Sequence, residues 1–268
     1  KDPYEVYAAE RPAEWWPMPT DQDINDNELY LLYHISKPNS LPSPGDSWIF
    51  NFQGTAGSTV TIEYGAMANG SFVADATKTE TVSIVSANTS YPHTFTMKYY
   101  DFQANDLSNN DRQVMIKISS DGDIKQVNWS AAPNINSYST IEGLVEFKGK
   151  ATKITSLRLG DYNNYYGCNK MSFFSLLGTN MIVNAHRMLY ENKNLLAVLE
   201  LNTSSVTNTS QMFYNCYSLQ TIPLLNTSSV TNTSQMFSGC YSLQTIPLLD
   251  TSSVTNTSQM FYNCYSLQ

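Results

Sequence analysis

The last third of the chain repeats one 24-residue unit, and this repetition constrains the fold more than any other feature. Met212–Gln235 reads MFYNCYSLQTIPLLNTSSVTNTSQ, and Met236–Gln259 differs from it at three positions. Met260–Gln268 copies the first nine residues, and Met188–Gln211 keeps the frame with more substitutions. A period of this length is typical of a solenoid, in which each unit buries its apolar side by stacking on its neighbours. Such a region presents a long regular surface, which favours binding over catalysis.

The repeat frame extends upstream of the well-preserved copies. Cys216, Cys240 and Cys264 are 24 residues apart, and Cys168 lies 48 residues before Cys216. We therefore expect the solenoid to span residues 164–268. The last copy stops nine residues into a unit, so we also expect the natural polypeptide to continue beyond Gln268, or another subunit to cover its last coil, because solenoids need a polar end cap.

Apolar residues at fixed positions predict the interior of each coil. The unit contains the leucine-rich pattern L-x-x-I-x-L. The predicted interior of the two best-preserved units is Met212, Phe213, Cys216, Leu219, Ile222, Leu224, Met236, Phe237, Cys240, Leu243, Ile246 and Leu248. Pro223 and Pro247 conflict with a central strand, because proline lacks a ladder donor. Either the strand is very short there, or the sheet is built from another part of the coil.

Polar residues also recur at fixed positions. Asn208, Asn232 and Asn256 are predicted to form a side-chain ladder between coils. Tyr217, Tyr241 and Tyr265 form a repeated aromatic position, which either packs between coils or forms a binding surface for a glycan or a protein.

The remainder of the chain divides into three regions. Residues 1–28 form a proline- and tryptophan-rich arm, which we expect to be extended. Its anchoring residues are Arg11, Pro12, Trp15, Trp16 and Pro19, and the tryptophans dock the arm either on its own domain or on a partner. Residues 131–163 are read as a linker and the N-terminal cap of the solenoid.

Residues 29–130 read as an antiparallel β-sandwich. Seven short segments show alternating or β-branched patterns: 29–35, 48–52, 59–64, 81–85, 94–100, 114–119 and 124–129. Asn69-Gly70 and Asp121-Gly122 are hairpin signals, because type I′ turns need positive φ at both central residues. The predicted fold is therefore mainly β, an N-terminal sandwich followed by a separate leucine-rich-repeat-type solenoid.

Charge excludes several classes of partner. The net charge is −8, and only 14% of the residues are charged, which argues against nucleic acid. From residue 201 to the end the only charged residue is Asp250, so long-range steering is not the recognition mechanism. The chain has no run of 18 apolar residues, so the sequence does not predict membrane insertion. The first residues lack the apolar stretch of a signal peptide.

Candidates for catalysis or metal binding are weak. His34, His93 and His186 are the only histidines and suggest no nucleophile–base set, so we expect no enzyme and no cofactor. Asp21, Asp23 and Asn25 have the spacing of the opening ligands of a calcium loop, but Asp26 stands where that loop needs glycine and Leu32 where it needs glutamate. The cysteine spacing fits neither a zinc site nor a disulfide framework, so we expect free buried thiols.

Two resemblances add to this interpretation. Leu243–Cys264, LQTIPLLDTSSVTNTSQMFYNC, resembles the BspA-like leucine-rich repeats, although Thr209, Thr233 and Thr257 stand where the usual unit has Met. That resemblance implies a surface or virion adhesin. The segment with Arg11, Pro12, Trp15, Met18, Pro19 and Thr20 resembles the R-P-x-x-W-x-x-M-P-T opening of structural proteins of tailed marine bacteriophages.

Together these features predict a non-enzymatic phage virion protein of the tail-fibre, receptor-binding or capsid-decoration type. Its partners would be other virion proteins, or a protein or glycan of the host surface, within an oligomeric assembly. A bacterial cell-surface adhesin of the BspA-like type is the alternative, and a decoration protein with a purely architectural solenoid is a third.

Overall fold

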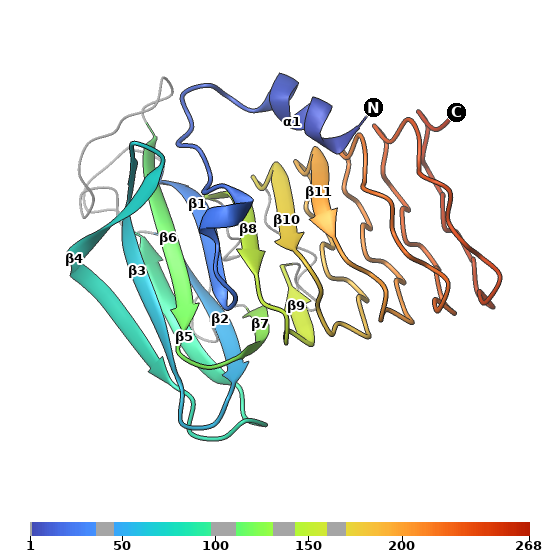
Figure 1. The fold of residues 1–268 in the computed structure, drawn as a ribbon. Helices are drawn as coiled ribbons and strands as arrows, with labels where there is room; N and C mark the ends of the chain where they lie inside the picture. The colour runs from blue at the N-terminus through green and yellow to red at the C-terminus, as the bar shows by residue number, and fades with distance from the viewer. Residues whose placement is uncertain (1, 36–45, 98–110, 131–142, 160–169) are drawn as a thin grey trace.

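The computed structural model describes residues 2–35, 46–97, 111–130, 143–159 and 170–268 and confirms a mainly β protein with open, mixed sheets (Figure 1). Within these residues, the larger sheet has seven strands in the order β11-β10-β8-β1-β6-β3-β4, and the smaller has four in the order β5-β2-β7-β9. The strands are β1 (Glu28–Ile35), β2 (Asp46–Gly54), β3 (Thr59–Ala68), β4 (Ser71–Ser83), β5 (Tyr91–Met97), β6 (Arg112–Ser120), β7 (Ile124–Ser130), β8 (Leu144–Lys150), β9 (Ser156–Arg158), β10 (Phe173–Leu177) and β11 (Ala197–Leu201).

The central strand β1 is buried on both faces. Leu29, Leu31 and Tyr33 point into a core that both sheets line, whereas Tyr30 and Leu32 belong to a second cluster under the N-terminal arm. Period-2 alternation sends successive side chains to opposite faces, so a strand with apolar residues at every position needs cover on both sides. All eight residues of β1 are buried.

The seven strands expected within residues 29–130 overlap β1 to β7, and the pairs that these strands form are antiparallel. Parallel pairing enters with the later strands, because β10 pairs in parallel with β8 and β11, and β9 with β7. Both sheets are therefore mixed.

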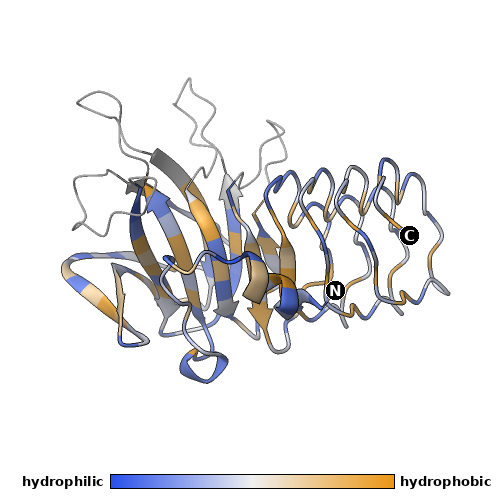
Figure 2. Cartoon of the chain, turned by 90° about the horizontal axis from the view of Figure 1, so that it is seen from above, coloured by the Kyte–Doolittle hydropathy of each residue, from blue (hydrophilic) through white to orange (hydrophobic). Residues whose placement is uncertain are grey.

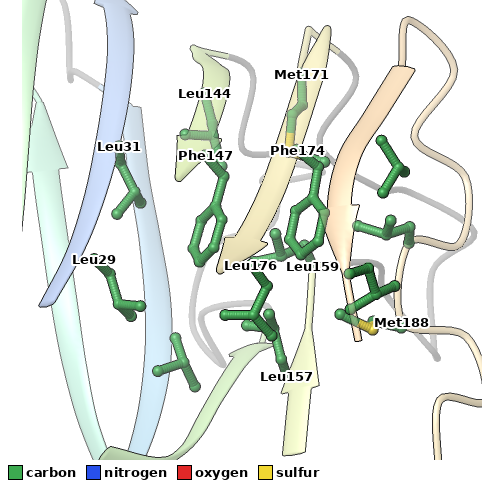
Figure 3. Close-up of a cluster of buried hydrophobic side chains, with 14 of the residues drawn as sticks. Leu29, Leu31, Leu144, Phe147, Leu157, Leu159, Met171, Phe174, Leu176 and Met188 are labelled. Carbon is green, nitrogen blue, oxygen red and sulfur yellow. The ribbon is translucent and has the colours of Figure 1, made fainter. Parts of the chain in front are cut away.

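The larger sheet runs without a break from the N-terminal region into the repeats. Strand β8 pairs with β1 on one side and β10 on the other, and Phe147 stacks on Phe174 with ring centroids 5.2 Å apart (Figure 3). Apolar side chains from β1, β8, β10 and the first coils form one continuous core. The expectation of two separate β structures is wrong, because residues 144–150 form a strand that joins them.

One of the two expected hairpin turns is wrong. Asn69 and Gly70 have φ of 50° and 80° and connect β3 to β4 as expected. Asp121-Gly122 instead links β6 to β7, which belong to different sheets. Gly122 is needed for a close approach, because a Cβ there would lie 2.7 Å from the Cβ of Ser58. The Asp121-Gly122 segment is therefore a crossing between sheets and not a hairpin turn.

The N-terminal arm contains a helix that was not expected. Helix α1 (Pro3–Glu10) starts with a capping box in which the Asp2 side chain accepts from the Tyr4 amide, and proline sits at its first turn, where its missing donor has no cost. A short 3-10 helix, η1 (Asp21–Asp23), follows. Val6 of α1 packs on Phe173, Ala197 and Leu199, so the arm covers the outer face of the larger sheet.

Neighbouring repeat units lie side by side and are joined by backbone hydrogen bonds, like adjacent strands of a parallel sheet. The amide of Thr231 donates to the carbonyl of Thr207, and the amide of Thr255 donates to that of Thr231. Equivalent residues form parallel bridges, such as Asn208 with Asn232. After β11 the ladder on the other side of the coil shrinks to a single bridge between Ala197 and Thr221. Proline at 223 and 247 is compatible with this geometry, because no strand continues there.

Most of the predicted interior positions are buried, but two are wrong. Leu224 is 72% exposed and Leu248 is 91% exposed, whereas Leu225 is buried and Leu249 packs against the core. Leu224 and Leu225 are equivalent to Glu200 and Leu201 of β11. There Glu200 points outward and Leu201 inward, after an irregularity in the pairing of β11 with β10. The L-x-x-I-x-L pattern assumed unbroken alternation, and the irregularity shifts the buried residue by one. The other predicted interior residues, of which Ile246 is only partly buried, contact the core.

The inter-coil side-chain ladder is made of glutamine and not of asparagine. Each asparagine oxygen accepts from an amide two residues on in its own coil, as Asn232 does from Ser234 at 3.0 Å. By contrast, Gln211 Nε2 donates to Gln235 Oε1 at 2.6 Å, and Gln235 Nε2 donates to Gln259 Oε1 at 2.7 Å. The short asparagine side chain at the start of a turn accepts a hydrogen bond from a nearby backbone amide of its own coil, so it is not available to the next coil.

Candidate functional surface

The repeated tyrosines form an ordered column on the surface of the coils, called here the tyrosine column. Tyr217 and Tyr241 stack with ring centroids 4.8 Å apart and planes 5° from parallel, and Tyr241 and Tyr265 with centroids 5.5 Å apart. Tyr217 is half-buried, Tyr241 is 39% exposed and Tyr265 is 76% exposed. The rings thus pack between coils, as one of the two readings expects, and they also reach the surface.

Lys193 occupies the same position in the preceding unit and ends the tyrosine column. Its Nζ lies 5.7 Å from the centre of the Tyr217 ring and 3.4 Å from Glu191 Oε2. A cation over an aromatic face is attracted by the ring quadrupole. Burial, and then the negative charge of Glu191, raise the pKa of the Tyr217 hydroxyl, so this phenol stays protonated and can donate a hydrogen bond.

A second stacked pair lies beside the tyrosine column. The rings of Tyr190 and Tyr214 have centroids 5.1 Å apart, and the guanidinium of Arg187 sits 4.9 Å from the Tyr190 ring centre. The next unit has Ser238 at this position, and the following unit has the exposed Tyr262. Sequence reasoning missed this second position, although the same 24-residue comparison would have found it.

The backbone between the two aromatic positions is held in the left-handed region in every unit. Glu191, Asn215 and Asn263 have φ of 59°, 56° and 61°, and Gly239 has φ of 79°. Asparagine and glycine tolerate this conformation better than other residues. Asn215 Nδ2 donates to Glu191 Oε1 at 2.6 Å, which fixes this turn to the preceding coil.

The column stands on a buried layer of aromatic and sulfur side chains. Phe213, Phe237 and Phe261 stack with centroids 5.4 and 5.6 Å apart. The thiol of Cys216 donates to the carbonyl of Leu189, and that of Cys240 to the carbonyl of Phe213, at 3.2 and 3.1 Å. Burial raises the pKa of both thiols, so they are unreactive packing groups. Cys168 lies outside the described residues.

The predicted anchoring residues of the arm contact their own chain. Arg11 Nε donates to Glu146 Oε2 at 2.9 Å, and Arg11 also donates to the carbonyls of Trp15 and Trp16. Trp15 packs edge-on against His34 at 5.0 Å, and the carbonyl of Pro19 accepts from Lys148 Nζ at 2.9 Å.

The tryptophans and Pro12 of the arm do not offer a free anchor. Trp15 and Trp16 are partly buried against the arm clusters, and the half-exposed Pro12 lies just after α1. Of the two readings, the structure shows docking on the chain's own sheet.

The remaining candidate sites of the sequence do not come together. Asp21 pairs with Lys148 at 2.6 Å, and Asp23 accepts from the hydroxyl of Thr20 at 2.5 Å, so both carboxylates have local partners. In the part of the chain that the structure describes, no group of three or more His, Cys, Asp or Glu residues is placed to hold a metal ion. No helix among the described residues is long and apolar enough to cross a membrane.

Comparison with known proteins gives one finding, and it concerns the repeats. No curated protein and no solved structure matches the chain. Residues 167–268 match the family described as "Mycoplasma protein of unknown function, DUF285". The match begins three residues after the expected start of the solenoid, includes the whole tyrosine column, and is consistent with a BspA-like repeat protein.

Proposed function

We propose that this chain is a non-enzymatic recognition protein whose repeat region binds a protein or glycan through the tyrosine column. In this proposal residues 164–268 form a leucine-rich-repeat-type solenoid of the BspA-like kind, and residues 29–130 form a β-sandwich whose larger sheet continues into the solenoid through β8 and β10. The observation that carries the proposal is the stacking of Tyr217, Tyr241 and Tyr265 on a nearly uncharged surface.

The chemistry of this surface supports recognition by contact and hydrogen bonding. Tyrosine offers a large amphipathic contact area with few rotatable bonds, and Ser, Gly and Asn add adaptable hydrogen bonds, as in antibody paratopes. Stacking holds each ring before a ligand arrives, which lowers the entropy lost on binding. Lys193 and Glu191 give the column one charged end.

The setting that we propose is a virion, where the solenoid would touch the host surface or neighbouring subunits. A bacterial cell surface is the second candidate, and the family description, which names Mycoplasma proteins, supports a bacterial source. Because the arm is docked on its own sheet, attachment to a particle or cell would use another surface of the N-terminal region.

A binding screen tests the proposal. The purified protein would be applied to a glycan array and to immobilised fibronectin, laminin and collagen, beside the variants Tyr241→Ala and Val73→Ala. Val73 is 52% exposed on β4, outside the repeats, and is the control. We expect binding that Tyr241→Ala weakens by about tenfold or more, the loss typical of a central aromatic contact, and that Val73→Ala leaves unchanged. Binding that Tyr241→Ala leaves intact would contradict the proposal.

A further inference from the structure

A second surface of the repeats is apolar and uncovered. Two adjoining hollows of about 430 and 860 Å³ share Leu224 and form what is called here the leucine groove. The groove is lined by Pro223, Leu224, Pro247 and Leu248, and Tyr4 of α1 stands at one end. It lies beside the N-terminal end of α1, which reaches over the first coils (Figure 2).

The exposure of Leu224 is a property of its place in the unit. A complete unit lies on either side of it, with Glu200 and Leu248 at the equivalent positions, and Leu224 is nevertheless 72% exposed. The unit therefore directs this position to solvent, and the sequence places leucine there twice. Contiguous exposed apolar residues mark interaction sites more often than isolated ones do.

The same face of the coils already holds a helix one unit earlier. Val6 of α1 packs on Ala197 and Leu199 of β11. In the 24-residue frame Leu199 corresponds to Pro223 and Pro247, so the surface on which α1 packs continues into the leucine groove. A short helix lying along this face would thus extend a contact that the fold already makes in one chain.

The charges around the groove select the partner. Asp2 lines the first hollow, Asp250 lines the second, and Glu200 lines a third hollow that also shares Leu224. None of the described residues that line these three hollows is a lysine or arginine. A second copy of the chain would bring like carboxylates together, and its net charge of −8 opposes association. A basic segment has the opposite sign.

We propose that the leucine groove binds a short basic amphipathic helix of a partner protein. Leucine-type side chains at i, i+3, i+4 and i+7 would fill the space over Leu224 and Leu248, and lysine or arginine at the flanks would face the carboxylates. The apolar contact supplies most of the affinity, because exposed ion pairs contribute little by themselves. This inference concerns a different surface from the tyrosine column.

Three labelled peptides of about 16 residues, long enough for a marginal helix, test the proposal by fluorescence anisotropy. The first has leucine on one face and lysine on the other, the second has glutamate in place of lysine, and the third has serine in place of leucine. We expect only the first to bind. Leu224→Ser should weaken its binding by about tenfold, as loss of a central apolar anchor does. Val85→Ser removes an equally exposed aliphatic side chain outside the repeats and should have no effect.

Four outcomes would overturn the inference. They are absence of binding by the leucine–lysine peptide, equal binding by the serine–lysine peptide, binding that Leu224→Ser does not change, and self-association of the protein that Leu224→Ser abolishes. Tyr241→Ala should leave peptide binding intact, which keeps this test independent of the function proposed for the tyrosine column.

Discussion

The guanidinium of Arg11 and the carboxylate of Glu146 form an ion pair that fastens the N-terminal arm to the larger sheet. Their side chains are 12% and 3% exposed, and the Nε–Oε2 distance is 2.9 Å. Burial raises the pKa of Glu146, and the positive charge of Arg11 opposes that rise. The carboxylate is thus tolerated in the sheet face because the arm supplies its partner.

Arg11→Met should therefore destabilise the protein by about 3–5 kcal/mol at pH 7, since it removes the cation paired with a buried carboxylate. Urea unfolding followed by tryptophan fluorescence measures the loss. The double variant Arg11→Met/Glu146→Gln should recover most of it, and the single variant should regain stability as the pH falls and Glu146 takes up a proton. A coupling energy near zero in this double-mutant cycle would show that the pair does not hold the arm.

The buried His34 predicts a dependence of stability on acid pH. Burial lowers its pKa from 6.5 to about 4, with smaller effects from Asp111 and Lys170. Because the folded state binds the proton less readily than the unfolded state, stability is full above pH 6.5 and is lost as the pH falls towards 4. The loss is on the order of 3 kcal/mol. The difference in unfolding free energy between the protein and His34→Gln, measured from pH 7 to 4, should carry this slope; parallel curves would contradict it.

The thiols should differ in reactivity according to their burial. Cys216 and Cys240 are fully buried, whereas Cys264 is partly exposed. In native protein treated with iodoacetamide, mass spectrometry should find label at Cys264 well before the other two. Cys240→Ser should cost about 1–3 kcal/mol, the price of burying a more polar group. Rapid native labelling of Cys240 would show that its coil opens.

The interrupted tyrosine position predicts a stabilising substitution. Tyr190 and Tyr214 stack, but Ser238 stands between Tyr214 and the exposed Tyr262. Ser238→Tyr restores the residue of the neighbouring units and should add about 0.5–1.5 kcal/mol through stacking. Thermal unfolding of the variant beside Ser242→Tyr, a change outside this position, measures the effect. A lower melting temperature for Ser238→Tyr would mean that the coil cannot accommodate the ring.

The repeat period alone predicted the buried Met212, Phe213 and Cys216, because identical units can bury residues only at identical places. It did not predict that Leu225 and not Leu224 is interior, since an irregularity of pairing in β11 is a property of the folded sheet. The docking of Arg11 on Glu146 joins residues 135 positions apart, and no local pattern encodes such a contact. The tyrosine column was visible as a period, but its stacking geometry was not.

The continuous sheet also determines how the repeats find their order. Two adjacent units differ at only three positions, so each could dock where the other belongs, and a coil displaced by one unit would lose few of its own contacts. Strands β8 and β10 differ from the later coils, and Phe147 pairs with Phe174 at a site that no later unit can imitate. Folding that starts at this junction and proceeds one coil at a time would place every unit correctly. In such a pathway the N-terminal region would act as the template that sets the register of the repeats.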